Sequence, residues 1–208
     1  MNTLKLILGI LVITAFHGCA TMSEKECLSS DWYAVGFEDG NRGYDANHFS
    51  KHHKACTKHG VTADFATYQS GRQQGLGEFC KPSRAFQYGS QGKQYTGVCP
   101  AEMESEFQVA YRDGKRLYKM KSDIRSVTSE IRTRDQELDE TESKLATASD
   151  LLVREGLSVK ERELLLEETL ELTKTRDYLE EEIASLEHEK AGLERRYANY
   201  RESLRNVY

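Results

Sequence analysis

The residues best suited to chemistry in this sequence lie in one short histidine-rich segment, residues 48–59. If the segment is helical, steps of four, four and three residues place His48, His52, Cys56 and His59 on one face. Imidazole nitrogen and thiolate sulfur are ligands that zinc and copper accept. The spacing makes these four residues weak candidates for a metal site.

Two observations favour a plainer interpretation of the same segment. Three lysines, Lys51, Lys54 and Lys58, are interleaved with the candidate ligands, and their positive charges disfavour a bound cation. A disulfide would also consume Cys56. We therefore expect a solvated helix face fixed by one cysteine, with no metal and no cofactor. The sequence contains no Gly-x-Ser-x-Gly elbow and no glycine-rich phosphate loop, so we expect no enzymatic activity.

The first residues have the form of an export signal. Lys5 precedes an apolar run over residues 6–16, which is shorter than the ~20 residues that span a bilayer. The run leads to Gly18-Cys19, which resembles the lipobox of bacterial lipoproteins, although Phe16 and His17 depart from its usual pattern.

The resemblance implies a signal peptide over residues 1–18, a lipid anchor on Cys19 and a tether over residues 19–30. Ala20 is not the aspartate that retains such proteins in the inner membrane, so we expect the outer membrane, facing the periplasm. Ordinary cleavage after Ala20 is the alternative.

The other four cysteines are an even number in an exported chain, which predicts two disulfides with three possible pairings. If the first two helices are antiparallel, Cys27 before the first lies beside Cys56 near the end of the second. Cys80 and Cys99 flank one loop. We therefore predict the pairs Cys27–Cys56 and Cys80–Cys99, and the other two connectivities stay open.

Capping residues and glycines predict helices over residues 32–41, 46–59 and 62–79, and a further helix starting at Pro100. Pro82 and Pro100 bracket a stretch that we expect to be a glycine-rich loop. An aromatic residue followed by two small residues recurs along this region, which predicts helices packed closely through their backbones. The copies are Trp32…Gly36-x-x-x-Gly40, Tyr68…Gly71-x-x-x-Gly75, Phe107…Ala110-x-x-x-Gly114 and, in degenerate form, Phe86…Gly89-x-x-Gly92.

Six motifs follow one another along this region. They are Asp31-Trp32-x-x-x-Gly36-x-x-Asp39-Gly40, Cys56-x-x-His59-Gly60, Tyr68-x-x-Gly71-x-x-x-Gly75-Leu76, Phe79-Cys80, Tyr95-x-Gly97-Val98-Cys99-Pro100 and Phe107-x-x-x-Tyr111-x-x-Gly114. With these motifs, residues 31–118 resemble the bacterial lipoprotein family known as domain of unknown function 2799. We expect a cysteine-, glycine- and aromatic-rich helical domain over these residues, and the resemblance implies no activity.

Beyond this domain, residues 119–208 carry two coiled-coil seams that are out of phase with each other. Gly156 and a Ser158-x-x-Glu161 capping box separate them. We predict an antiparallel hairpin with its turn near residues 156–158, and the rival is one continuous helix that dimerises in parallel. The hairpin would pair Leu145 with Thr169, Leu138 with Arg176, Ile131 with Ile183 and Leu117 with Tyr197. The first seam is Leu117, Met120, Ile124, Val127, Ile131, Arg134, Leu138, Thr141, Leu145, Ala148 and Leu152, and the second is Leu165, Thr169, Leu172, Arg176, Leu179, Ile183, Leu186, Lys190, Leu193, Tyr197, Tyr200 and Leu204.

The formal net charge of −5 over 208 residues disfavours nucleic acid as a partner, because phosphate neutralisation needs clustered lysine and arginine. We expect an all-α envelope lipoprotein with a structural or protein-interaction role. Its expected partners are the membrane, through the lipid, and other envelope proteins or the cell wall. The alternative is a periplasmic lipoprotein that binds a small ligand or a metal.

Overall fold

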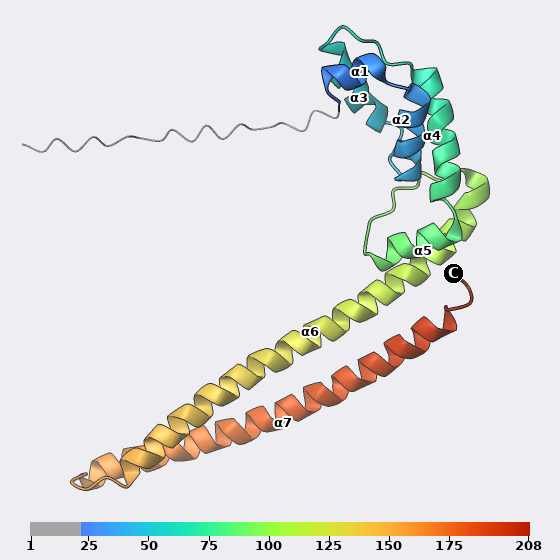
Figure 1. Cartoon of the computed structure of the whole chain (residues 1–208). Helices are drawn as coiled ribbons and strands as arrows, with labels where there is room; N and C mark the ends of the chain where they lie inside the picture. Colours follow the sequence, from blue (N-terminus) through green and yellow to red (C-terminus); the bar gives the residue numbers. More distant parts are fainter. Residues whose placement is uncertain (1–21) are drawn as a thin grey trace, which may run out of the picture. The chain divides into compact units, whose positions relative to one another are not determined.

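The computed structural model describes residues 22–208, which form helices joined by turns and loops, with no strand among them (Figure 1). The predicted all-α fold is confirmed. The predicted signal peptide and Cys19 lie outside the described residues. In chain order the helices are α1 (Glu24–Ser29), α2 (Trp32–Asn41), α3 (His48–Thr57), α4 (Phe65–Phe79), α5 (Pro82–Ser90), α6 (Ala101–Leu152) and α7 (Val159–Ser203).

Internal contacts divide the chain into two compact units between Phe79 and Cys80. The first unit contains α1 to α4, and the second contains α5 to α7. Helix α6 runs without a break through residues 118 and 119, between which we expected a domain boundary. Over residues 22–208, no helix combines the length and apolar composition that a membrane span requires.

In the first unit, α2 and α4 pack through glycines that leave no room for a side chain. A Cβ atom on Gly36 would lie 2.0 Å from the Tyr68 carbonyl oxygen, and one on Gly75 would lie 2.1 Å from the Phe37 carbonyl oxygen. The contact is reciprocal, since each helix presents glycines to the other's backbone. We call the contact formed by Gly36, Gly40, Gly71 and Gly75 the first glycine clasp. It confirms the close packing predicted from the paired small residues.

Side chains and glycines set the helix ends largely as predicted. Asp31 accepts hydrogen bonds from the Tyr33 and Ala34 amides and caps α2. Gly43 has a φ of +75°, and a Cβ there would meet the Phe79 ring at 2.4 Å. The next two helices begin later than predicted, α3 at His48 rather than residue 46 and α4 at Phe65 rather than residue 62. The α4 start shifts because Asp64, rather than Thr62, accepts from the Thr67 amide and hydroxyl.

The segment expected to be a tether contains a helix that joins the core. Ser23 and Glu26 form a capping box at the start of α1. The helix carries Cys27, which pairs with Cys56 of α3 in the predicted disulfide. Met22 and Cys27 are buried beside Ala55 and Cys56, with Trp32, Val35 and Val61 packed around them. Residues 22–30 are therefore part of the first unit.

The second unit opens with a helix where we expected a loop. Pro82 occupies the first turn of α5, where its missing N–H is not needed. Gly89 of α5 and Gly114 of α6 form a second glycine clasp, in which a Cβ on Gly89 would lie 2.2 Å from the Tyr111 carbonyl oxygen and one on Gly114 would lie 2.2 Å from the Phe86 carbonyl oxygen. The loop is shorter, residues 91–100, and the predicted Cys80–Cys99 disulfide spans α5 and this loop.

The rest of the second unit is the predicted antiparallel hairpin, in which α6 and α7 lie side by side (Figure 1). The chain turns at Gly156, with a φ of +87°, and Ser158 and Glu161 form the predicted capping box. Every residue of both predicted seams is buried or partly buried. Arg134 Nε lies 3.0 Å from Glu182 Oε2 across the hairpin, which agrees with the predicted register.

Candidate functional site

The first unit contains a buried polar cluster formed by Asp39, His48, His52 and Tyr68. His52 Nε2 is 2.8 Å from Asp39 Oδ2, and the Tyr68 hydroxyl donates to the same oxygen at 2.7 Å. His48 Nε2 lies 4.0 Å from the other carboxylate oxygen. Asp39 is 5 % exposed, His52 7 % and Tyr68 1 %. A carboxylate is rarely buried this deeply without paired partners, and here two of them donate to it.

Three helices position these side chains. Asp39 lies on α2 beside Gly40, and Tyr68 lies on α4 against Gly36, so the first glycine clasp brings the carboxylate and the phenol together. His48 and His52 are one turn apart on α3, and both imidazoles meet Asp39. The Tyr44 ring stacks on His48 with the ring centroids 4.1 Å apart, which orients that imidazole.

Burial and hydrogen bonding lower the pKa values of Asp39 and His48 and raise that of Tyr68. Burial opposes ionisation of Asp39, but the hydrogen bonds from His52 and Tyr68 outweigh it and lower the pKa of Asp39. Burial lowers the pKa of His48, although the attraction of Asp39 partly offsets this. Burial and the bond to Asp39 raise the pKa of Tyr68, which stays a hydroxyl donor. His52 Nδ1 is buried and has no hydrogen-bond partner among residues 22–208.

The structure separates the four metal-ligand candidates predicted from spacing. Cys56 is in a disulfide, and His59 lies apart from the cluster, with Nδ1 3.9 Å from Glu24 Oε2. His48 and His52 do converge, but their companion is Asp39, which the spacing argument missed. Its place directly before a clasp glycine was no signal by itself, because Ser70 and Gln74 stand directly before Gly71 and Gly75 and are exposed.

A second feature lies at the turn end of the hairpin, where aliphatic side chains remain exposed outside the seam. Val159, Leu166 and Leu170 follow one face of α7 at steps of seven and four residues. We call the exposed aliphatic residues around the turn the turn-end patch, and their exposed fractions are 78 % for Val153, 78 % for Val159, 57 % for Leu164, 50 % for Leu166 and 61 % for Leu170.

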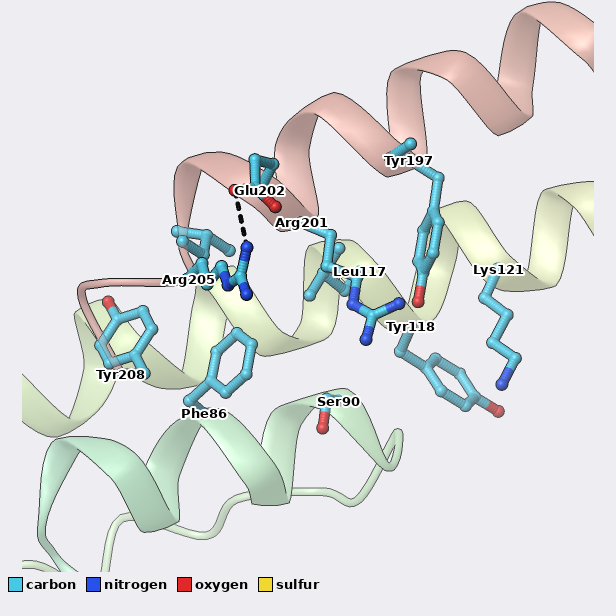
Figure 2. Close-up of a pocket in the computed structure, with 12 residues that line it drawn as sticks. Phe86, Ser90, Leu117, Tyr118, Lys121, Tyr197, Arg201, Glu202, Arg205 and Tyr208 are labelled. Atoms are coloured by element: carbon cyan, nitrogen blue, oxygen red, sulfur yellow. Dashed lines mark hydrogen bonds and ion pairs between the residues drawn. The ribbon is translucent and has the colours of Figure 1, made fainter.

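At the opposite end of the hairpin, the last residues of the chain close onto α5 and α6. The Tyr208 ring stacks on Phe86 with centroids 4.8 Å apart (Figure 2). Tyr200 and Tyr208 each donate a 2.7 Å hydrogen bond to Asp113, one to each carboxylate oxygen. Leu117 and Tyr197 line the same hollow of about 910 Å³, which places this predicted seam pair together. These contacts fix α7 against the start of α6.

Comparison with known protein families gives a match to part of the chain. Residues 31–116 match the model of a family described as protein of unknown function (DUF2799), which confirms the resemblance inferred from the motifs. The match includes both glycine clasps and the three helices that carry the polar cluster, and it ends near the start of the hairpin. No curated protein and no solved structure matches the chain.

Proposed function

We propose that this protein is a lipid-anchored protein of the bacterial cell envelope, with a structural or interaction role, whose hairpin presents the turn-end patch to a partner protein. One observation carries the proposal. Val159, Leu166 and Leu170 stay exposed in a hairpin whose own seam is already filled. Apolar surface that the chain does not bury favours association with another surface.

The hairpin suits this role because it holds the turn-end patch far from the opposite end of the hairpin, where Tyr200 and Tyr208 contact Asp113. At ~1.5 Å per residue, the 45 residues of α7 extend about 68 Å. Contacts between α6 and α7 close the seam within one chain, so the arm needs no second copy to form. The aliphatic chemistry of the patch favours a protein partner over the polar polymer of the cell wall.

The proposed location rests on the sequence and on the cysteines. Two disulfides favour an oxidising compartment such as the periplasm. The Gly18-Cys19 junction after a short apolar run supports acylation of Cys19, and Ala20 supports the outer membrane. Several acyl chains at ~0.8 kcal/mol per buried methylene would anchor the protein firmly.

Site-specific photocrosslinking in intact cells tests the docking role. A photoreactive amino acid replaces Leu170 in the full chain, and a matched control carries it at Glu171, which is exposed but outside the aliphatic row. We expect one discrete adduct with a different protein from position 170 and none from position 171. A Val159→Glu, Leu166→Glu background should abolish that adduct, because it makes the same row polar while leaving the seam intact.

Three results would contradict the docking role. They are the absence of an adduct at position 170, the same adduct at position 171, and an adduct formed only with a second copy of this chain. The helix content of each variant, measured by circular dichroism, shows that the hairpin is still folded.

A further inference from the structure

The two glycine clasps are copies of one structural motif. In each, a glycine of the first helix meets a carbonyl of the second, and a glycine with positive φ after the first helix lies under an aromatic ring. In each, a side chain of the second helix donates a hydrogen bond to a carbonyl of the connecting loop. These residues of the first copy have equivalents in the second copy: Gly40 corresponds to Gly89, Gly43 to Gly92, Gly75 to Gly114, Phe79 to Tyr118, Arg72 to Tyr111 and Tyr44 to Lys93.

This correspondence shows that the polar cluster of the first clasp has no counterpart in the second clasp. The same spacing places Tyr88 at the position of Asp39 and Phe107 at the position of Tyr68. Phe107 is fully buried and packs against Tyr95, and the residue equivalent to Asp39 is a tyrosine rather than an acid. Residues 91–100 connect α5 to α6 without a helix, whereas residues 42–64 include α3 with both histidines. The clasp therefore forms equally well without the acid and the histidines.

We propose that Asp39, His48 and His52 form a binding site for a divalent transition-metal ion of the zinc class. One carboxylate oxygen and two imidazole nitrogens supply the protein ligands, and water completes the coordination. The site is independent of the docking role proposed for the hairpin. It lies in the first unit and shares no residue with the turn-end patch.

The distances suit a metal of this size. Bonds of about 2.0–2.2 Å in a tetrahedral zinc site place neighbouring ligand atoms roughly 3.3 Å apart. His52 Nε2 is 2.8 Å from Asp39 Oδ2 and His48 Nε2 is 4.0 Å from Asp39 Oδ1, values on either side of that separation. One ligand atom from each residue lies within 4.8 Å of the others. Small side-chain rotations would bring all three to bonding distance, and the proton that His52 holds on Nε2 would move to Nδ1, which frees the Nε2 lone pair for the metal.

The surroundings prepare the ligands for a cation. The Tyr68 hydroxyl holds the Asp39 carboxylate in place, which is the role of an outer-shell hydrogen bond at a metal centre. Tyr44 stacks on His48 and orients it. The His48 side chain is 17 % exposed while that of Asp39 is 7 % exposed, so an ion and its waters would enter past His48. Two imidazoles and one carboxylate match zinc and similar first-row ions better than calcium or magnesium, which prefer oxygen ligands alone.

Titration of the full chain with Co²⁺ and Zn²⁺ tests the site. The protein is first treated with a chelator, then Co²⁺ binding is followed by visible absorption and Zn²⁺ binding by calorimetry. We expect one equivalent of either metal to bind and to raise the unfolding temperature. His48→Ala should lower the affinity at least tenfold, whereas His53→Ala, the adjacent histidine of the same helix outside the cluster, should leave it unchanged.

A second variant keeps the test decisive if His48→Ala impairs folding. Tyr68→Phe removes only the hydroxyl, and the second clasp already accommodates phenylalanine at the equivalent position. We expect this variant to stay folded and to bind metal roughly 10–100-fold more weakly, the usual effect of losing an outer-shell partner. Absence of binding to the wild-type chain would overturn the proposal. So would binding that His48→Ala and Tyr68→Phe leave unchanged, or binding that His53→Ala weakens equally, since either result would indicate surface histidines.

Discussion

At the scale of single residues, the clasp glycines are fixed by contact rather than by backbone conformation. Gly75 and Gly77 lie two residues apart on α4 and have opposite surroundings. A Cβ on Gly75 would lie 2.1 Å from the Phe37 carbonyl oxygen, whereas one on Gly77 would meet nothing within 4 Å. Alanine substitutions at the two positions therefore separate two effects. Both gain the helix preference of alanine, but only the one at Gly75 also introduces a steric clash.

We expect Gly75→Ala to lower the free energy of unfolding by roughly 3 kcal/mol, because neither backbone can move away without opening the clasp. Gly77→Ala should raise it by up to about 1 kcal/mol, the helix preference of alanine over glycine. Urea unfolding of both variants, with disulfides intact, provides the comparison. Equal effects of the two substitutions would show that the clasp is looser than the structure indicates.

Tyr208 gives a prediction about pH. Burial, and then the hydrogen bond to Asp113, raise the pKa of Tyr208 to about 12. The folded state therefore holds this proton more tightly than the unfolded chain, whose tyrosines ionise near ~10. The contribution of Tyr208 to stability is full below pH ~10 and is lost as the pH rises through about 12.

The measurement is an ultraviolet titration of tyrosinate, taken as the difference between the wild-type chain and Tyr208→Phe. We expect the missing component to titrate near pH 12. Asp113→Asn, which removes the negative charge beside the hydroxyl, should move that component towards pH ~10. A component at pH ~10 in the wild-type chain would mean that the Tyr208–Asp113 contact does not form.

Single residues also show what a sequence can predict. The number of cysteines predicted two disulfides, and their positions beside the predicted helices favoured one of three pairings, whose two pairs both form. The polar cluster was predicted only in part. The period of α3 placed His48 and His52 on one face, but Asp39 reaches them from another helix. That contact depends on how closely α2 and α3 approach each other, and the periodicity of residues along one helix gives no information about that distance.

At the scale of helices, the hairpin was predictable because its pattern repeats over many turns. An unbroken first seam would have placed Glu155, Thr173, Glu180 and Glu187 inside. The three glutamates are exposed, and only Thr173 is partly buried. Helix α5 was not predictable in the same way. Its one glycine, Gly89, resembled a loop glycine, and only its close approach to the Tyr111 carbonyl of α6 accounts for it.

The pairing of α6 with α7 can be tested by introducing two cysteines. Ile131→Cys with Ile183→Cys should form a disulfide within one monomer, because both positions lie on the seams in register. Ile131→Cys with Leu172→Cys uses two seam positions out of register and should not crosslink. Non-reducing electrophoresis and peptide mapping distinguish the products. Linked dimers through position 131 alone would indicate a parallel rod in place of the hairpin.

At the scale of the whole molecule, the proposed anchor determines how the protein is retained in the cell. We expect the mature chain to begin at Cys19, carrying thioether-linked diacylglycerol and an N-acyl chain. Mass spectrometry of the amino-terminal peptide checks this directly. Cys19→Ala should move the protein out of the membrane fraction, and a mature chain that begins unmodified at Thr21 would indicate ordinary secretion.

The reciprocal clasp also bears on how such a chain can change during evolution. A glycine set against a carbonyl of another helix cannot be exchanged without a matching change in its partner. The second clasp, in contrast, forms without an acid or histidines at the positions equivalent to Asp39 and α3. Duplication of the motif would leave one copy free to acquire a new role while the other preserves the architecture. Two proteins that share only the clasp glycines therefore share an architecture. Only a protein that also has Asp39, His48 and His52 is expected to share the proposed metal site.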